Sequence, residues 1–399
     1  MNKYENKYEE NQKSVDDYFL KTNDYQEWMD LVQNIKKQTR WIETNLNLIH
    51  PYFFGAFGPM EYESIRKNFN TDFSTTVLQD TANNSQYFMR IFKDDYLISS
   101  ETIPLSGVAK TELLERLGLD CPIMQKGILG VKNTQVVLNL TLRKLNELKQ
   151  QKIKLLVRFD KIRGILSKSY TPINIPDLWD ITFPIMSKFL SGYYDHDYCR
   201  YRLGVNADGI VERYANIAEE ISQNLGKKVH PQFYVEISSS DTAGGAVTVY
   251  TGFLIGTTYI RFRKVSRVLH VGHSLEEVKK LLASALVANA NTDAIESFLK
   301  LGQVKYPKSC LAMVATKIGI SNHKIDQILE QFSVPQCTWF RVYLELSKVF
   351  SEMERSKNYS VTKIDAMRDS TMSLLLSGNV NDYDVSPEVV MATIFKKKK

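Results

Sequence analysis

The sequence is poor in cysteine, and its cysteines lie far apart. It has 4 among 399 residues, with no CxxC pair: Cys121, Cys199, Cys310 and Cys337. A zinc knuckle needs closely spaced thiols, and a small extracellular fold held by disulfide bonds needs many cysteines. The sequence therefore predicts neither. We expect a reducing, cytoplasmic environment.

Long apolar runs are also missing. The first residues, MNKYENKYEENQKSVDDYF, are polar, and no uncharged apolar stretch approaches the roughly 20 residues of a membrane span. We therefore expect neither secretion nor a membrane partner. With 43% hydrophobic and 24% charged residues, 19 Gly and 11 Pro, the composition is that of a globular chain. Its length suffices for two or three domains with a real core.

Catalytic signatures are the third absence. The sequence has no Walker A loop, GxSxG or HExxH, and no GxGxxG between a strand and a helix. We predict a protein that is not an enzyme and uses no cofactor.

The metal-ligand types that are present are poorly arranged for binding. The segment YYDHDYC gathers Asp195, His196, Asp197 and Cys199. Neighbours on an extended segment point to opposite faces, so a solvated loop is favoured and no metal site is predicted. A metal-dependent nuclease on Asp195 and Asp197 would need a further carboxylate, such as Asp177, Asp180 or Glu212.

A second pair of possible metal ligands, His270 and His273, has no third ligand at a useful spacing. Ser274 and Glu277 beside them predict a helix capping box.

Apolar periodicity predicts an α+β fold, with an antiparallel β-sheet body, packed helices and a helical C-terminal region. Residues 1–60 are expected to form a helical segment, because Trp28, Leu31, Ile35, Trp41 and Ile42 recur at helical spacings. Residues 61–280 are expected to form the α+β core, and residues 281–399 the helical region. Strands are predicted for 233–238, 246–250 and 259–263.

The C-terminal region contains a pattern typical of a helix-turn-helix. Ala315 stands four residues before Gly319, and Ile325 and Ile328 follow that glycine at six and nine residues, with Ser321 as a candidate N-cap. A second helix would offer Asn322, His323, Lys324 and Gln327 to DNA. Because Asp326 and Glu330 balance this set, a unit used only for packing is favoured over a DNA reader.

Basic strands are the more informative pattern. The net charge of +6 is mild, but residues 149–168 hold seven Lys or Arg and one acid, and no acid occurs in 250–275. Alternation would place these cations on one solvent-facing sheet surface with tyrosines for base stacking. The predicted nucleic-acid-binding residues are Arg158, Lys161, Arg163, Lys168, Tyr170, Tyr259, Arg261, Arg263, Lys264 and Arg267. The alternative is a solvated strand face with ordinary ion pairs.

The stretch RGILSKSY, residues 163–170, combines a glycine with basic and hydroxyl side chains. Gly164 permits a turn, Arg163 and Lys168 flank it, and Ser167 and Ser169 add hydroxyl donors suited to phosphate oxygens. The alternative is that apolar residues anchor the turn while the polar ones sit in water.

Three blocks resemble a family of phage- and plasmid-borne proteins grouped as domain of unknown function 932: IPLSGVAKTELLERLGLDCP, RGILSKSYTPINIPDLWD and the hairpin leading to HVGH. The resemblance covers about residues 104–286. The chain departs from the family after Gly252, where it reads GFLIGTTYIRF in place of a Cys-x-Asn-Gly-like turn. The resemblance implies a product of mobile elements, in the host cytoplasm if phage-encoded, and leans toward DNA handling. It supplies no catalytic residues.

Two functions follow as expectations. The first is non-enzymatic binding of DNA, with single strands favoured, in phage or plasmid recombination or replication. The second is a structural or protein-interaction factor, in phage assembly or host takeover, that uses the aromatic run 52–57 and the C-terminal helices. A homo-oligomer is compatible with both.

Overall fold

The computed structural model describes most of the chain. The described residues are 20–53, 87–93, 98–119, 141, 143–145, 147, 151–159, 161–186, 188–195, 198–204, 211–242, 246–271, 273–288, 299–332, 336–356, 359–377 and 380–395. Most of the aromatic run 52–57 and all of Cys121, His196 and Asp197 lie outside them.

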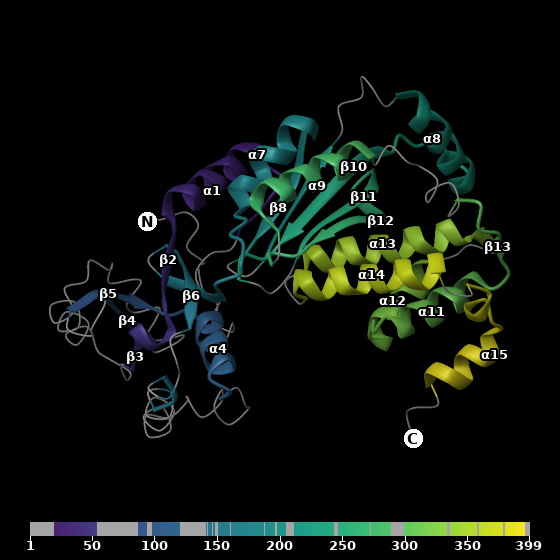
Figure 1. Ribbon diagram of the computed structural model, residues 1–399. Coiled ribbons are helices and arrows are strands. Elements are labelled where there is room, and N and C mark those ends of the chain that lie inside the picture. Colours follow the sequence, from purple (N-terminus) through teal and green to yellow (C-terminus); the bar gives the residue numbers. More distant parts are fainter. Residues whose placement is uncertain are drawn as a thin grey trace.

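An antiparallel six-stranded sheet forms the centre of the larger body (Figure 1). Its strand order is β1 (Leu20–Thr22), β8 (Lys188–Tyr194), β9 (Cys199–Gly204), β10 (Gln232–Ser239), β11 (Val247–Ile255) and β12 (Thr258–Val268). The last three strands contain the alternating segments from which the sequence predicts strands. The predicted α+β fold with antiparallel strands is confirmed.

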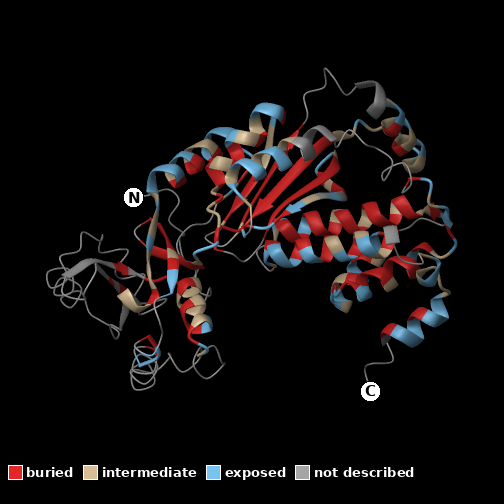
Figure 2. Ribbon diagram, viewed as in Figure 1, coloured by how far each residue is buried: buried red, intermediate tan, exposed pale blue. Residues whose placement is uncertain are grey.

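Helices cover both faces of this sheet (Figure 1). One layer consists of α1 (Tyr25–Gln38), α7 (Ile175–Met186) and α9 (Leu275–Ala288), and the other contains α13 (Trp339–Arg355) and α14 (Val361–Ser377). Helix α8 (Val211–Leu225) lies at the end of the sheet away from the smaller body. Because both faces are covered, the central strands are buried almost throughout (Figure 2).

The N-terminal segment is not wholly helical, which corrects the sequence prediction. Asp24 caps α1 by accepting a hydrogen bond from the Glu27 amide, and the helix ends at Thr39, whose backbone is extended. Trp41 and Ile42 then lie in β2 (Thr39–Asn45). The β-branched and aromatic residues of TRWIET favour a strand, and pairing with β6 outweighs the helical spacing of the two apolar residues.

A smaller body surrounds a second hydrophobic core. It contains a sheet of β2, β6 (Lys152–Arg158) and β7 (Lys161–Ser167), and another of β3 (Ile49–Phe53), β4 (Tyr87–Lys93) and β5 (Ile98–Pro104). A 3-10 turn, η1 (Leu46–Leu48), links β2 to β3, and α4 (Gly107–Arg116) packs on β7. Apolar side chains such as Ile153, Leu155 and Ile165 tie the first sheet to this core.

The C-terminal region is helical, as predicted. It contains α11 (Pro307–Lys317), α12 (Asn322–Gln331), α13, α14, η5 (Val380–Tyr383), α15 (Pro387–Val390) and η6 (Met391–Phe395). Two short strands, β13 (Gln303–Val304) and β14 (Cys337–Thr338), pair with each other. They lie before α11 and after α12 in the sequence, and the sequence did not predict them. In the described part of the chain, no helix is both long and apolar enough to cross a bilayer.

Two helices joined by a turn occur where the sequence predicts them, with α11 before Gly319 and α12 after it. Gly319 has φ of +85°, which glycine adopts without strain, and Ala315, Ile325 and Ile328 are buried. The Ser321 side chain makes no capping hydrogen bond. On α12, Lys324 lies 3.5 Å from Glu352 of α13, and its neighbours Asp326 and Glu330 are exposed. This acidic exposed face is poorly suited to DNA and favours a packing role for the unit.

Candidate nucleic-acid interface

The tip of the β6–β7 hairpin is inserted between the two bodies. Phe159, at the turn, adopts φ of +52° and belongs to the core of the larger body. Beside it, the Arg158 guanidinium donates to Tyr194 Oη at 3.1 Å and to Thr39 Oγ1 at 2.8 Å, and lies 2.6 Å from an Asp241 carboxylate oxygen. These polar contacts hold Arg158 in the interior, where it is 1% exposed.

A β-bulge in the same hairpin changes the facing of its cations. Leu156 pairs with Gly164 and Val157 with Ile162, so Arg163 is an extra residue on β7. Arg163 is buried and its Nε donates to the Arg158 carbonyl at 3.4 Å. Lys161 pairs with Arg158 across the ladder and is also buried. The three cations nearest the turn therefore face the molecular interior.

Arg261 belongs to a buried ionic cluster between the large sheet and the α13–α14 pair. It binds Glu236 on β10 and lies 2.7 Å from Asp365 and 3.0 Å from Asp369 on α14. The remaining members come from β9, α13 and α14: Arg200, Arg202, Glu354 and Arg368. Opposite charges alternate across the cluster, so each arginine meets at least one carboxylate.

The electrostatics of this cluster follow from its burial. Burial by itself raises the pKa of the Glu236 carboxyl, but Arg261 and Arg202 outweigh burial and hold that pKa below its usual range. The pKa of Glu354 is lowered in the same way, against burial, by Arg200 and Arg202. Both carboxylates stay ionised, and the cluster joins two helices to three strands.

Both tyrosines proposed for base stacking are already engaged. The Tyr170 ring is buried and stacks on His270, with 5.0 Å between centroids and 3° between planes. The half-buried Tyr259 has the Arg202 guanidinium 3.9 Å above its ring and the Tyr234 ring edge-on at 5.2 Å. These stacked partners occupy faces that a nucleobase would need.

The prediction of one exposed basic surface is therefore wrong for half of its members. Arg158, Lys161, Arg163, Tyr170 and Arg261 are all buried, because the hairpin tip is inserted and because helices cover both faces of the large sheet. The alternation in the sequence could not reveal that a helical layer, which supplies Asp365 and Asp369, covers the side of the sheet on which Arg261 lies.

Three other predicted residues are exposed. Lys168 lies just after β7, and Lys264 and Arg267 lie on β12. Lys264 is 3.3 Å from Asp369. The side chain of Arg263 is outside the described part of the structure. A β-bridge between Tyr170 and Val271 brings the segment that carries Lys168 against the residues that follow β12.

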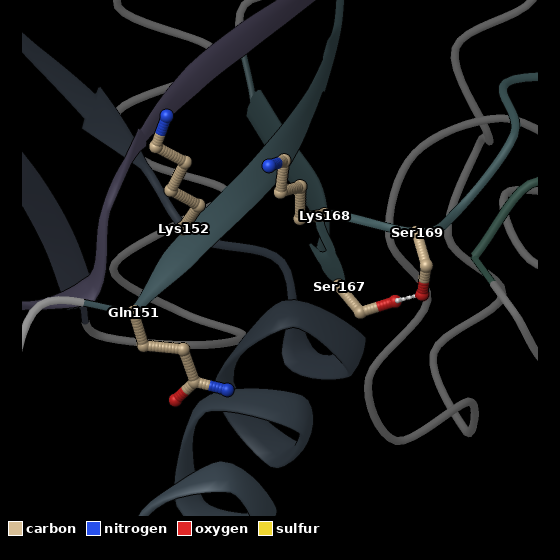
Figure 3. A pocket seen from close by; sticks show the side chains of 5 residues that line it. All are labelled: Gln151, Lys152, Ser167, Lys168 and Ser169. Atoms are coloured by element: carbon tan, nitrogen blue, oxygen red, sulfur yellow. Dashed lines mark hydrogen bonds between the residues drawn. The ribbon is translucent and has the colours of Figure 1, made fainter.

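Another basic feature of the described residues is a hollow of about 620 Å³ at the open end of the β6–β7 hairpin, hereafter the lysine–serine hollow. It is lined by Gln151, Lys152, Ser167, Lys168 and Ser169. In Figure 3, Lys152 and Lys168 extend toward the same side of the hairpin, and the hydroxyls of Ser167 and Ser169 meet at 3.0 Å.

This hollow was only partly found from the sequence. Lys168, Ser167 and Ser169 were singled out, but Lys152 was not. A two-residue turn without a bulge would pair Lys152 with Ser167, whereas the observed pairing of Ile153 with Ser167 brings Lys152 opposite Lys168. The bulge at Arg163 sets that register. The turn predicted at Gly164 is wrong, because Gly164 lies within β7 and pairs with Leu156.

The other candidate ligands do not converge. Among the described residues, no group of three His, Cys, Asp or Glu side chains is arranged to hold a metal ion. Asp195 instead accepts hydrogen bonds from the Tyr198 amide at 2.8 Å and Tyr193 Oη at 2.7 Å. Ser274 and Glu277 form the predicted reciprocal capping box, with amide contacts of 3.2 and 2.6 Å.

Comparison of the chain with models of protein families, with curated proteins and with solved structures found no match.

Proposed function

We propose that the protein binds nucleic acid, single-stranded DNA in the first instance, through the lysine–serine hollow, without carrying out chemistry on it. The resemblance to phage and plasmid proteins favours a role in recombination or replication. The observation that carries the proposal is that Lys152 and Lys168, which extend to one side of the hairpin, line one open hollow together with Gln151, Ser167 and Ser169.

These residue types suit a phosphodiester. Two ammonium groups supply attraction that does not depend on base identity, and hydroxyl and amide donors fix the orientation of phosphate oxygens. Lys168 is exposed and no acidic side chain is among the lining residues. A ligand can therefore reach the cations without first displacing a carboxylate from the hollow.

The test is a titration of labelled oligothymidylate at two salt concentrations with the Lys152→Ala/Lys168→Ala double variant. Loss of two phosphate contacts should weaken binding to any sequence and reduce the salt slope by about one or two counterions. The matched control is Lys227→Ala/Lys228→Ala, which removes the same charge from an exposed segment after α8. Equal affinity and slope in both double variants would contradict the proposal.

A further inference from the structure

We infer that Trp41 provides a base-stacking subsite next to the lysine–serine hollow, so that the ligand is a single strand whose phosphate lies in the hollow and whose base lies on the indole. This inference rests on the proposed function. It adds the residue that distinguishes a single strand from a duplex.

Trp41 differs from every other tryptophan of the chain. The sequence has four, and Trp28, Trp179 and Trp339 are 0%, 3% and 2% exposed within the core of the larger body. Trp41 is half-buried, on β2 of the small sheet. A large aromatic ring that keeps a solvent-facing part on a rigid strand is suited to stacking on a base.

The strand register places Trp41 on the same face of the small sheet as Lys152, one of the residues that line the hollow. Trp41 lies opposite Leu156, Glu43 opposite Lys154, and Asn45 opposite Lys152. Residues directly opposite each other on paired strands lie on the same face of a sheet. Alternate residues along one strand also share a face. Trp41 and Lys152 are therefore on one face, separated by roughly 13 Å along the strand direction, at about 3.3 Å per residue. A few nucleotides of extended strand cover that distance.

A second path connects the two through Tyr170. Ser169 of the hollow directly precedes Tyr170, whose ring centroid is 5.9 Å from that of Trp41 with 30° between the planes. Lys154 Nζ donates to the Tyr170 carbonyl at 2.9 Å. The hollow, Lys154 and Trp41 thus form one continuous strip over β6 and β2.

The charges along this strip indicate where the phosphate and the base of the ligand would bind. Glu43 lies 3.9 Å from Lys154 and its side chain is 78% exposed, so it opposes an anion at the middle of the strip. The phosphate is therefore assigned to the hollow, and the uncharged base to Trp41.

The indole N–H supports the same assignment. Trp41 Nε1 is buried and has no hydrogen-bond partner. A buried donor without an acceptor is unfavourable, and no hydrogen bond fixes the present ring orientation. A ring that turns outward to meet a base exposes this N–H to water or to a ligand oxygen, so stacking removes that penalty.

The test uses intrinsic fluorescence, because the other three indoles are buried. Oligothymidylate should quench part of the wild-type tryptophan emission, and the Trp41→Phe variant should lose that quenching. Trp41→Ala should weaken oligothymidylate binding about 5- to 150-fold, the equivalent of one lost base–aromatic stack. Trp41→Phe, which keeps a ring, should weaken it less, and duplex binding should be the same in all three proteins.

The outcomes separate the two proposals. If Lys152→Ala/Lys168→Ala weakens DNA binding but Trp41→Ala does not and no emission is quenched, the subsite is wrong and the hollow stands. If neither set of changes affects binding, both proposals are wrong. Equal loss of single-strand and duplex binding in Trp41→Ala would also overturn the subsite, since a stack on a free base cannot act on a paired one.

Discussion

At the scale of single residues, the space left by a neighbouring side chain decides whether a position can hold anything larger than glycine. Gly192 in β8 lies under the indole of Trp28, and a Cβ atom there would be 2.2 Å from Trp28 Cε3. Trp28 is fully buried and packs on Phe189 and Tyr201, so the ring has no free space into which to move.

We therefore expect Gly192→Ala to destabilise the protein by overpacking, by about 1–3 kcal/mol or more. The measurement is the free energy of unfolding from urea denaturation, followed by tryptophan emission. Gly302→Ala is the control, because a Cβ at Gly302 would meet no atom within 4 Å. Similar stability of the two variants would show that Trp28 does not occupy the position described.

Several single-residue features were predictable because their causes are local. Gly319 and the Ser274–Glu277 box depend on residues a few positions apart, and both occur as predicted. The partners of Arg261 on α14 are 104 and 108 residues away in sequence. No local pattern could show that these carboxylates, and not a phosphate backbone, meet the arginine.

At the scale of elements, α13 and α14 are held to the sheet by both apolar packing and charge. Glu354 near the end of α13 contacts Arg200, Arg202 and Arg368. Removing one partner of a buried ion cluster leaves desolvated charge, which costs far more than an exposed ion pair contributes.

Glu354→Gln should lower the free energy of unfolding by about 3–5 kcal/mol, since three buried arginines lose a shared counter-charge. The control is Glu352→Gln on the same helix, whose side chain is 53% exposed and 3.5 Å from Lys324. That change should cost about 0–1 kcal/mol. Chemical denaturation of both variants measures the difference, and equal losses would mean that the cluster contributes no more than a surface pair.

Element types were predicted better than element partners. The strands within 232–268 occur where the sequence predicts them, because they are long and their alternation is regular. Strand β2 was missed, because tertiary pairing with β6 competes successfully with a helical spacing. The same strand carries Trp41, so the aromatic part of the proposed site could not be found without the sheet.

At the scale of the whole molecule, the larger and smaller cores meet where the hairpin of β6 and β7 contacts the end of the large sheet. His270, just after β12, is 4% exposed and stacks on Tyr170, and its Nε2 is 3.3 Å from Ser239 Oγ. Burial lowers the pKa of His270, although the nearby Asp241 carboxylate opposes that shift. The folded protein therefore keeps this ring neutral more readily than the unfolded chain does.

The sign of the pH dependence follows from this difference. Below the ordinary histidine pKa of 6.5, the unfolded chain binds a proton at His270 that the folded chain binds less readily. The contribution of His270 to stability is therefore complete above that pH and decreases as the pH falls below it. We expect the free energy of unfolding to decline from about pH 7 to about pH 5.5. His270→Phe, which keeps a ring against Tyr170 but cannot titrate, should reduce the slope of that decline. Urea denaturation of both proteins across this range measures the slopes, and parallel curves would show that the contact between the two cores does not bury a neutral histidine.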